Sequence, residues 1–145
     1  MRVTKKASAE WSGSIKEGTG YISTESGVLD RRPYGFNTRF EGKPGTNPEE
    51  LIAAAHSACF TMALSLFLSE ANYTADKLET NAQVTIEKIN EGFKITTIHL
   101  SLKAKIPGVN QTQFQEFANK AKLNCPVSKL FEGNTQISLE AMLEN

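Results

Sequence analysis

Residues 47–71 read "NPEELIAAAHSACFTMALSLFLSEA", and the architecture of the chain follows from them. Asn47 can cap a helix, Pro48 suits the first helical position, and Glu50 completes a capping-box pattern with Asn47. From Leu51 to Leu68 no residue carries a formal charge. We therefore expect one long helix from Pro48 to about Ala71.

The uncharged run reaches the lower length limit of a membrane span. It carries five polar side chains, namely His56, Ser57, Cys59, Thr61 and Ser65. Acidic residues flank it without the Lys/Arg asymmetry typical of membrane helices. A helix that is apolar on every side is usually buried at the centre of a protein. We expect a buried central helix and no membrane partner.

The segments around this helix predict strands on both sides. Residues 7–24 alternate weakly and predict a hairpin that turns near Gly18–Gly20. Residues 25–47 lack periodicity and are interrupted by Gly and Pro; a connection this long either covers the core or has a function. Two long antiparallel strands are expected around residues 82–86 and 98–106, with a turn at Asn90–Gly92 and a bulge near Thr96–Thr97.

The last third of the chain predicts a helix, a helical turn and a strand. Phe114, Phe117, Ala118 and Ala121 follow helical spacing. This helix should end at Cys125 because Pro126 disfavours helical geometry in the residue before it. A short helical turn at residues 130–131 and a strand over residues 137–143 complete an α+β fold.

Composition limits the classes of function. A chain of 145 residues fits a single domain over residues 1–145. Lys+Arg and Asp+Glu both number 16, so the chain is not basic enough for a typical nucleic-acid binder. Two cysteines are too few for a disulfide scaffold. The N-terminus lacks the apolar core of a secretory signal, so we expect a cytoplasmic protein with reduced thiols.

Cys59 is the candidate reactive group, although a free cysteine in a helix often serves only packing. Apolar burial raises a thiol pKa, so a nucleophilic Cys59 needs a neighbouring cation. His56, one helical turn earlier, would form a Cys–His pair of the kind used in acyl transfer. Arg39 is the other candidate, with Glu49 as its orienting partner.

Helix geometry separates Glu49 from Cys59. Ten residues of unbroken helix place them about 15 Å apart along the axis. If they act together, Glu49 must come from a second copy of the chain, packed antiparallel about a two-fold axis. Alternatively, Glu49 only complements the helix dipole in the first turn.

Three motifs in this order and spacing, "YGFNTRFEG", "GTNPEELIAAAHSACF" and "NCPVSKLF", resemble the osmotically inducible protein C (OsmC) / organic hydroperoxide resistance family. The similarity extends from about Ala7 to the last strand. The segment "STESGVL…PYGFNTRFEG" resembles the OsmC branch more closely. The resemblance implies antiparallel β-sheets around a long buried central helix, in an intertwined homodimer with shared active sites.

The resemblance also implies roles for individual residues. Cys59 would be the peroxidatic cysteine and Cys125 the resolving cysteine, and Arg39, paired with Glu49, would activate the Cys59 thiolate. Organic hydroperoxides would be reduced to alcohols through a Cys59 sulfenic acid and a Cys59–Cys125 disulfide. A dithiol, typically a lipoyl group on a protein, would restore both thiols.

Two other classes of function stay open from the residues alone. One is a hydrolase or acyltransferase built on Cys59 and His56, and the other is a non-enzymatic dimer that binds a small ligand. No metal-ligand spacing is visible, and the peroxidase mechanism needs no metal or other cofactor. Phe60 and Phe67 could favour a bulky organic substrate or could simply pack the core.

Overall fold

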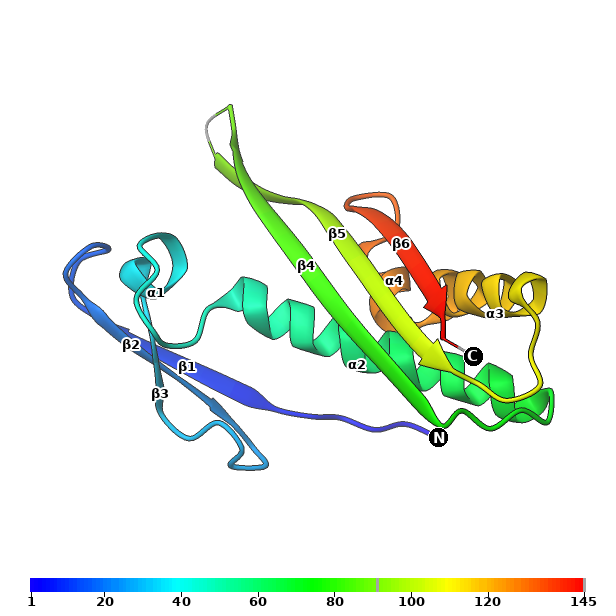
Figure 1. Ribbon diagram of the computed structural model, residues 1–145. Coiled ribbons are helices and arrows are strands. Elements are labelled where there is room, and N and C mark those ends of the chain that lie inside the picture. The colour runs from blue at the N-terminus through cyan, green and yellow to red at the C-terminus, as the bar shows by residue number, and fades with distance from the viewer. Residues whose placement is uncertain (91, 145) are drawn as a thin grey trace. The chain divides into compact units, whose positions relative to one another are not determined.

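The computed structural model describes residues 1–90 and 92–144 (Figure 1). Its backbone packs as two units, Met1–Leu51 and Ile52–Asn145, and each unit contains one three-stranded sheet. The elements are mixed α+β, as predicted. The expectation that residues 1–145 act as one domain stays a prediction.

The first unit is an antiparallel sheet followed by a short helix. Its strands, in sheet order, are β1 (Ala7–Ser12), β2 (Thr19–Thr24) and β3 (Arg32–Tyr34). The predicted hairpin is confirmed, but its turn lies over residues 13–18, earlier than expected. Gly20 is required where β2 passes two aromatic rings, because a Cβ there would lie 2.6 Å from Trp11 and from Tyr34.

The stretch over residues 25–47 is more ordered than its lack of periodicity indicated. It contains β3 and the five-residue helix α1 (Phe36–Phe40). Both elements are shorter than the window over which a hydrophobic period can be recognised. Their hydrogen bonds to β2 and within the loop could not be inferred from the residues in isolation.

The long helix α2 spans Pro48–Glu70, within one residue of the predicted end. Its start is capped as predicted, since the Glu50 N–H donates to Asn47 Oδ1 at 2.8 Å. The length and apolar composition of α2 would also allow it to cross a membrane. A core helix passes the same test, and α2 carries part of the core described below.

The second unit is a three-stranded sheet covered by helices. Its strands, in sheet order, are β4 (Lys77–Ile89), β5 (Gly92–Lys105) and β6 (Gln136–Leu143). The β4–β5 pair is antiparallel and the predicted bulge is confirmed, because Ile86 pairs with Ile95 and Thr85 with Thr97. In the predicted turn, Glu91 lies outside the described residues. Contrary to the expectation of purely antiparallel sheets, β6 runs parallel to β5, which alternation alone could not predict.

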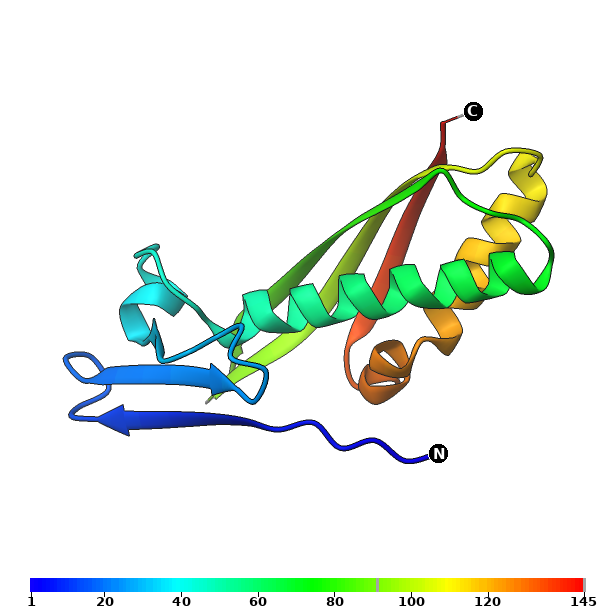
Figure 2. The same cartoon turned by 90° about the horizontal axis from the view of Figure 1, so that it is seen from below.

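Helices α3 (Gln111–Asn124) and α4 (Pro126–Phe131) lie where the sequence predicted a helix, a break and a helical turn. Helices α2 and α3 lie on one face of the β4–β6 sheet (Figures 1 and 2). The core between them is fully buried and consists mainly of Phe60, Leu64 and Leu68 from α2, Ile98, Leu100 and Leu102 from β5, and Phe114, Ala118 and Ala121 from α3.

Only one face of α2 is buried in the single chain. The opposite face is an exposed stripe of small and apolar side chains, formed by Ala54, Ala55, Ala58, Met62, Ser65, Leu66 and Ser69. Met62 is 76% exposed and Leu66 is 54% exposed. The predicted all-round burial of this helix is therefore not reached within one chain. We call this surface the α2 stripe.

Candidate active site

The two cysteines, 66 positions apart in the sequence, are neighbours in the second unit. Cys59 lies in the middle of α2 and is half-buried, whereas Cys125 is fully buried between α3 and α4. Both are free thiols. Cys125 lies near enough to Cys59 to raise the pKa of the Cys59 thiol. The fold thus places a second thiol against the first, as a disulfide-forming pair requires.

The surroundings of Cys59 within its own unit disfavour the thiolate. Burial raises the pKa of the Cys59 thiol, and the neighbouring Cys125 raises it further. A backbone hydrogen bond from Val127 lowers this pKa, but it ranks behind burial. A reactive Cys59 therefore needs a cation brought to it.

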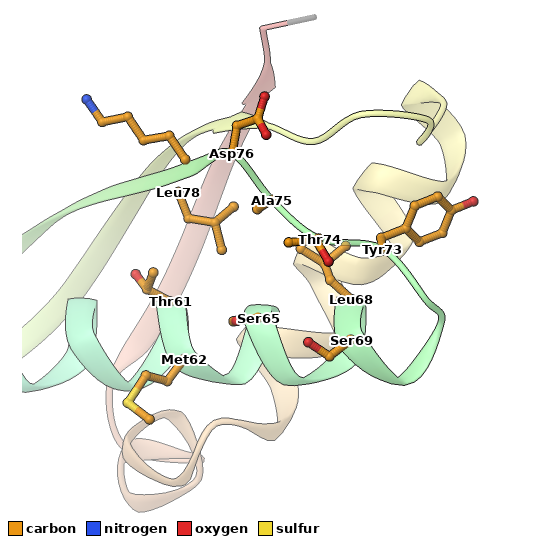
Figure 3. Close-up of a pocket in the computed structure, with 11 residues that line it drawn as sticks. Thr61, Met62, Ser65, Leu68, Ser69, Tyr73, Thr74, Ala75, Asp76 and Leu78 are labelled. Carbon is orange, nitrogen blue, oxygen red and sulfur yellow. The ribbon is translucent and has the colours of Figure 1, made fainter.

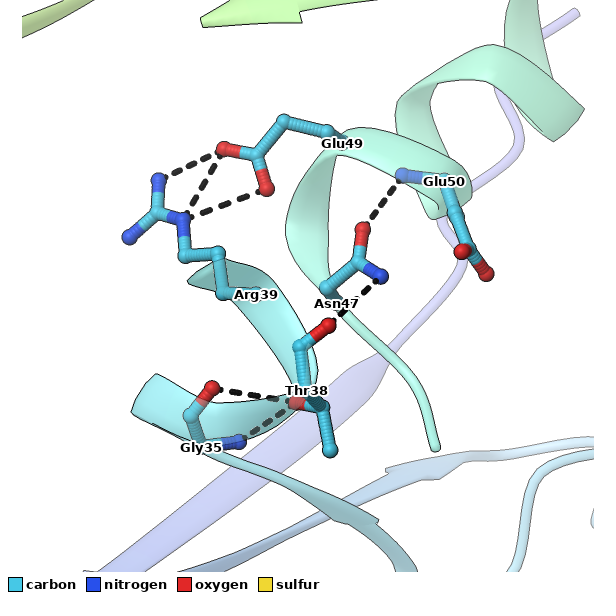
Figure 4. Close-up of polar contacts among 6 residues, drawn as sticks. All are labelled: Gly35, Thr38, Arg39, Asn47, Glu49 and Glu50. Atoms are coloured by element: carbon cyan, nitrogen blue, oxygen red, sulfur yellow. Dashed lines mark hydrogen bonds and ion pairs between the residues drawn. The ribbon is translucent and has the colours of Figure 1, made fainter. Parts of the chain in front are cut away.

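Arg39 and Glu49 form a forked ion pair within the first unit (Figure 4). Arg39 Nε donates to both carboxylate oxygens of Glu49, at 3.0 and 3.1 Å, and Nη2 donates to Oε1 at 2.6 Å. The Glu49 side chain is 10% exposed and that of Arg39 is 35% exposed. This two-pronged geometry fixes the plane of the guanidinium as well as its position.

A network of local hydrogen bonds positions this ion pair (Figure 4). The Thr38 hydroxyl accepts from the Gly35 N–H at 2.9 Å and donates to the Gly35 carbonyl at 3.0 Å, which closes the first turn of α1. Asn47 caps α2 and its amide donates to the Thr38 carbonyl at 3.4 Å. These hydrogen bonds connect α1 to the start of α2 and so hold Arg39 and Glu49 close to each other.

Arg39 also borders an apolar pocket of about 240 Å³ in the first unit. The guanidinium lies 5.3 Å from the centre of the Phe40 ring. The pocket is lined mainly by aromatic and aliphatic side chains, namely Trp11, Ile15, Tyr34, Phe36, Phe40 and Pro48. A charged group at the edge of an apolar pocket suits a ligand with a polar end and a hydrocarbon body.

His56 does not form the pair with Cys59 that the hydrolase hypothesis required. Its fully buried ring shares a hydrogen bond of 2.8 Å between Nε2 and Ser128 Oγ. Ser128 Oγ lies 3.2 Å from Cys125 Sγ, and the Ser128 backbone N–H donates to the same sulfur at 3.3 Å. Sequence reasoning missed Ser128. Its position could have indicated a contact with Cys125, because it lies three residues after this cysteine, which caps α4.

Other candidate features do not add to this site. Phe60 is fully buried in the core, and Phe67 packs against the core with Lys120 over its ring. A pocket of about 360 Å³ between α2 and the start of β4 contains neither cysteine (Figure 3). Among the described residues, no group of three or more His, Cys, Asp or Glu side chains could hold a metal ion.

Comparisons with known proteins show which family the chain resembles. The family model described as OsmC-like protein matches residues 40–140. The chain is 50% identical to peroxiredoxin OsmC of Escherichia coli (strain K12), over 100% of both chains. It is 37% identical to organic hydroperoxide resistance protein OhrB of Bacillus subtilis (strain 168), over 83% of this chain and 88% of that protein.

Solved structures of related proteins also resemble this chain. The crystal structure of OhrB from Bacillus subtilis matches with a TM-score of 0.72 at 33% identity, over 98% of both chains. An OsmC-like protein from Mycoplasma pneumoniae matches with a TM-score of 0.77 over 100% of both chains, and at 16% identity it supports the fold alone. The fold places the chain in a class of α+β proteins with two small sheets and a long helix. Within that class, this chain belongs to the OsmC-like family.

Proposed function

We propose that this protein is a thiol-dependent peroxidase that reduces organic hydroperoxides to alcohols, with Cys59 as the attacking thiol and Cys125 as the resolving thiol. The observation that carries the proposal is the contact between the two free thiols in the second unit. The relatives named peroxiredoxin OsmC and organic hydroperoxide resistance protein OhrB support the substrate class.

The chemistry needs three balanced steps. The Cys59 thiolate attacks the distal oxygen of ROOH, the O–O bond breaks, and the alkoxide takes a proton to leave as ROH. Cys59 is then a sulfenic acid, which condenses with the Cys125 thiol to give a disulfide and water. An external dithiol exchanges with this disulfide and restores both thiols. No metal or organic cofactor takes part in these steps.

Arg39 supplies the cation that the Cys59 thiolate needs. A guanidinium stays protonated at any physiological pH and offers donors beyond those bound to Glu49. Glu49 holds the fork in place, so that Arg39 can present a fixed charge to the thiolate and to the peroxide oxygens.

The functional unit is a homodimer with shared active sites. The α2 stripe is a continuous exposed surface of small and apolar side chains, which suits close packing against a second α2. An antiparallel arrangement about a two-fold axis brings Glu49 and Arg39 of one chain to Cys59 of the other, which overcomes the separation of about 15 Å along one helix.

The apolar pocket beside Arg39 accommodates the organic group R of the hydroperoxide. We expect its aromatic lining to favour a bulky hydrocarbon, with the peroxide oxygens at the edge of the pocket near the guanidinium. The reductant is a dithiol such as a lipoyl group on a carrier protein. The balanced net charge argues against a nucleic-acid partner, and a cytoplasmic location suits the reduced thiols.

Steady-state turnover of cumene hydroperoxide with dihydrolipoamide tests this proposal. The wild-type protein should turn over, and Cys59→Ser should abolish activity. Without dihydrolipoamide, Cys125→Ser should still reduce about one equivalent of peroxide and then stop as a sulfenic acid. Unchanged turnover in Cys59→Ser would refute the assignment. No hydrogen bond between His56 and Cys59 is found among the described residues in support of the hydrolase hypothesis, and His56 Nε2 pairs with Ser128 Oγ instead.

A further inference from the structure

A buried chain of hydrogen-bonding groups leads away from the resolving thiol. Cys125 Sγ, Ser128 Oγ and His56 Nε2 follow one another at 3.2 and 2.8 Å. Cys125 and His56 are fully buried, and Ser128 is 5% exposed. The three groups come from the α3–α4 junction, from α4 and from α2, so the fold assembles them from separate elements.

His56 is a costly residue to bury here. Its Nδ1 is shielded from solvent and has no hydrogen-bond partner among the residues that the structure describes. An unpaired polar nitrogen destabilises the folded state, whereas an aliphatic side chain of similar volume would not carry this cost. Packing beside the Phe131 ring would be served equally well by such a side chain. The imidazole therefore calls for an explanation other than packing.

The condensation step has a proton problem that this chain can solve. When Cys125 attacks the sulfenic acid of Cys59, the Cys125 S–H bond must break as the S–S bond forms. The Cys59 S–O bond breaks at the same time, and the departing hydroxide must gain a proton to leave as water. In a buried site, bulk water cannot readily accept the first proton, so a base within reach is needed.

We propose that Ser128 and His56 form a proton relay for the resolving thiol, in which Ser128 accepts the proton of Cys125 while passing its own hydroxyl proton to His56 Nε2. The inference rests on the peroxidase function proposed above. The imidazolium then releases the proton that it received, and the departing hydroxide takes up one proton and leaves as water. Thiol and sulfenic acid thus become disulfide and water, and His56 ends neutral.

Three observations support the relay. The Ser128 hydroxyl lies within hydrogen-bond distance of both Cys125 Sγ and His56 Nε2, so it can accept a proton from the sulfur and donate its own to the ring nitrogen. The Ser128 N–H also donates to Cys125 Sγ, so the developing thiolate is met by a fixed donor. Burial lowers the pKa of His56, which keeps the resting imidazole neutral and so leaves one ring nitrogen unprotonated; in the relay this nitrogen is Nε2.

The relay predicts a separation of the two chemical steps in variants of Ser128 and His56. Rapid-quench mass spectrometry with one equivalent of cumene hydroperoxide measures sulfenic acid, trapped with dimedone, and disulfide in the same samples. For Ser128→Ala and His56→Leu, sulfenic acid should form within about twofold of the wild-type rate. Disulfide formation should slow by about tenfold or more, since a positioned base contributes at least this much.

Conservative variants separate proton transfer from structure. Ser128→Thr keeps the hydroxyl and should restore most of the disulfide rate. His56→Gln keeps a hydrogen-bonding side chain but cannot hold the proton, so it should stay slow. The thermal midpoint of the double variant Ser128→Ala/His56→Leu should equal or exceed that of Ser128→Ala, since the double variant loses the unpaired Nδ1 without leaving the Ser128 hydroxyl unpaired.

Each other outcome has a definite meaning. Wild-type disulfide rates in Ser128→Ala and His56→Leu would overturn the relay, and so would an equal slowing of both steps, which indicates a structural role. If the wild-type protein forms sulfenic acid but no disulfide, or neither, the failure belongs to the proposed peroxidase function instead.

Discussion

Replacing Arg39 with Ala tests whether a cation ionises Cys59. Burial and the neighbouring Cys125 raise the pKa of this thiol, so without Arg39 the thiolate is scarce at pH 7. An opposite charge within about 4–6 Å lowers an acid's pKa by about one to three units, so its loss reduces the thiolate population about 10- to 1000-fold. A more basic thiolate is also more nucleophilic, and this offsets somewhat less than half of the loss on a logarithmic scale. The reaction of Cys59 with the peroxide should therefore slow by about 4- to 40-fold.

The assay is the rate of Cys59 sulfenic acid formation with cumene hydroperoxide between pH 6 and 9, an interval chosen around the ordinary thiol pKa of about 8.5. The rate should increase with pH because the thiolate is the reactive form. In Arg39→Ala the thiol pKa rises, so the rate should fall at pH 7 and should recover as the pH increases. In Arg39→Lys the charge remains but the fork with three contacts to Glu49 is lost, and an intermediate rate is expected.

A matched control is available in the same unit. Arg31 also pairs with a glutamate, Glu10, but both side chains are largely exposed, at 61% and 57%. Exposed ion pairs contribute little, so Arg31→Ala should leave the rate and its pH dependence unchanged. If Arg39→Ala reacts at the wild-type rate at pH 7 with an unshifted pH profile, the proposed role of Arg39 is wrong.

Three further outcomes follow from the same geometry. Met62→Glu in the α2 stripe should dissociate the proposed dimer in sedimentation experiments, whereas Val28→Glu, similarly exposed on a loop of the first unit, should not. A dimeric Met62→Glu protein would argue against the stripe as the interface. Because burial lowers the pKa of His56, stability should be full above the ordinary histidine pKa of about 6.5 and should decline as the pH falls below it; urea titrations should show a weaker decline in His56→Leu, and an identical decline would assign it to other groups. Inactive Cys59→Ser and Glu49→Ala subunits should regain activity when mixed, and absence of recovery after confirmed subunit exchange would contradict the shared site.

Most of the fold could be predicted because its elements are long and locally consistent. The cap at Asn47 and the uncharged run after it determined α2 almost to the residue. The alternation in β4 and β5, including the change of parity at Thr96, predicted the hairpin and its bulge. Pro126 marked the break between α3 and α4. These signals act over a few residues and depend little on tertiary contacts.

The features that sequence reasoning missed depend on contacts between distant segments. The parallel pairing of β6 with β5 follows from the chain passing through α3 and α4, which hydrophobic alternation cannot reveal. β3 and α1 are too short to carry a period. Ser128 belongs to the proposed relay because the fold places it between His56 and Cys125, which the sequence alone does not reveal.

The candidate site was identified from motifs, and its geometry came from the structure. The Arg39–Glu49 pair was expected from the residues and the Cys59–Cys125 pair from the family resemblance. The structure contains the Arg39–Glu49 fork and brings Cys125 near Cys59. His56 was the ambiguous residue, because spacing along α2 put it near Cys59. Its actual partner, across 72 positions of sequence, could be found only in three dimensions.

The most direct test of the central claim is intact and peptide mass spectrometry of the reduced protein before and after one equivalent of cumene hydroperoxide. Formation of one disulfide removes two hydrogens, so the account predicts a rapid loss of about two mass units that maps to a Cys59–Cys125 peptide pair. Two thiols that stay reduced, or that oxidise no faster than free cysteine, would contradict the claim that this thiol pair is a peroxidase site.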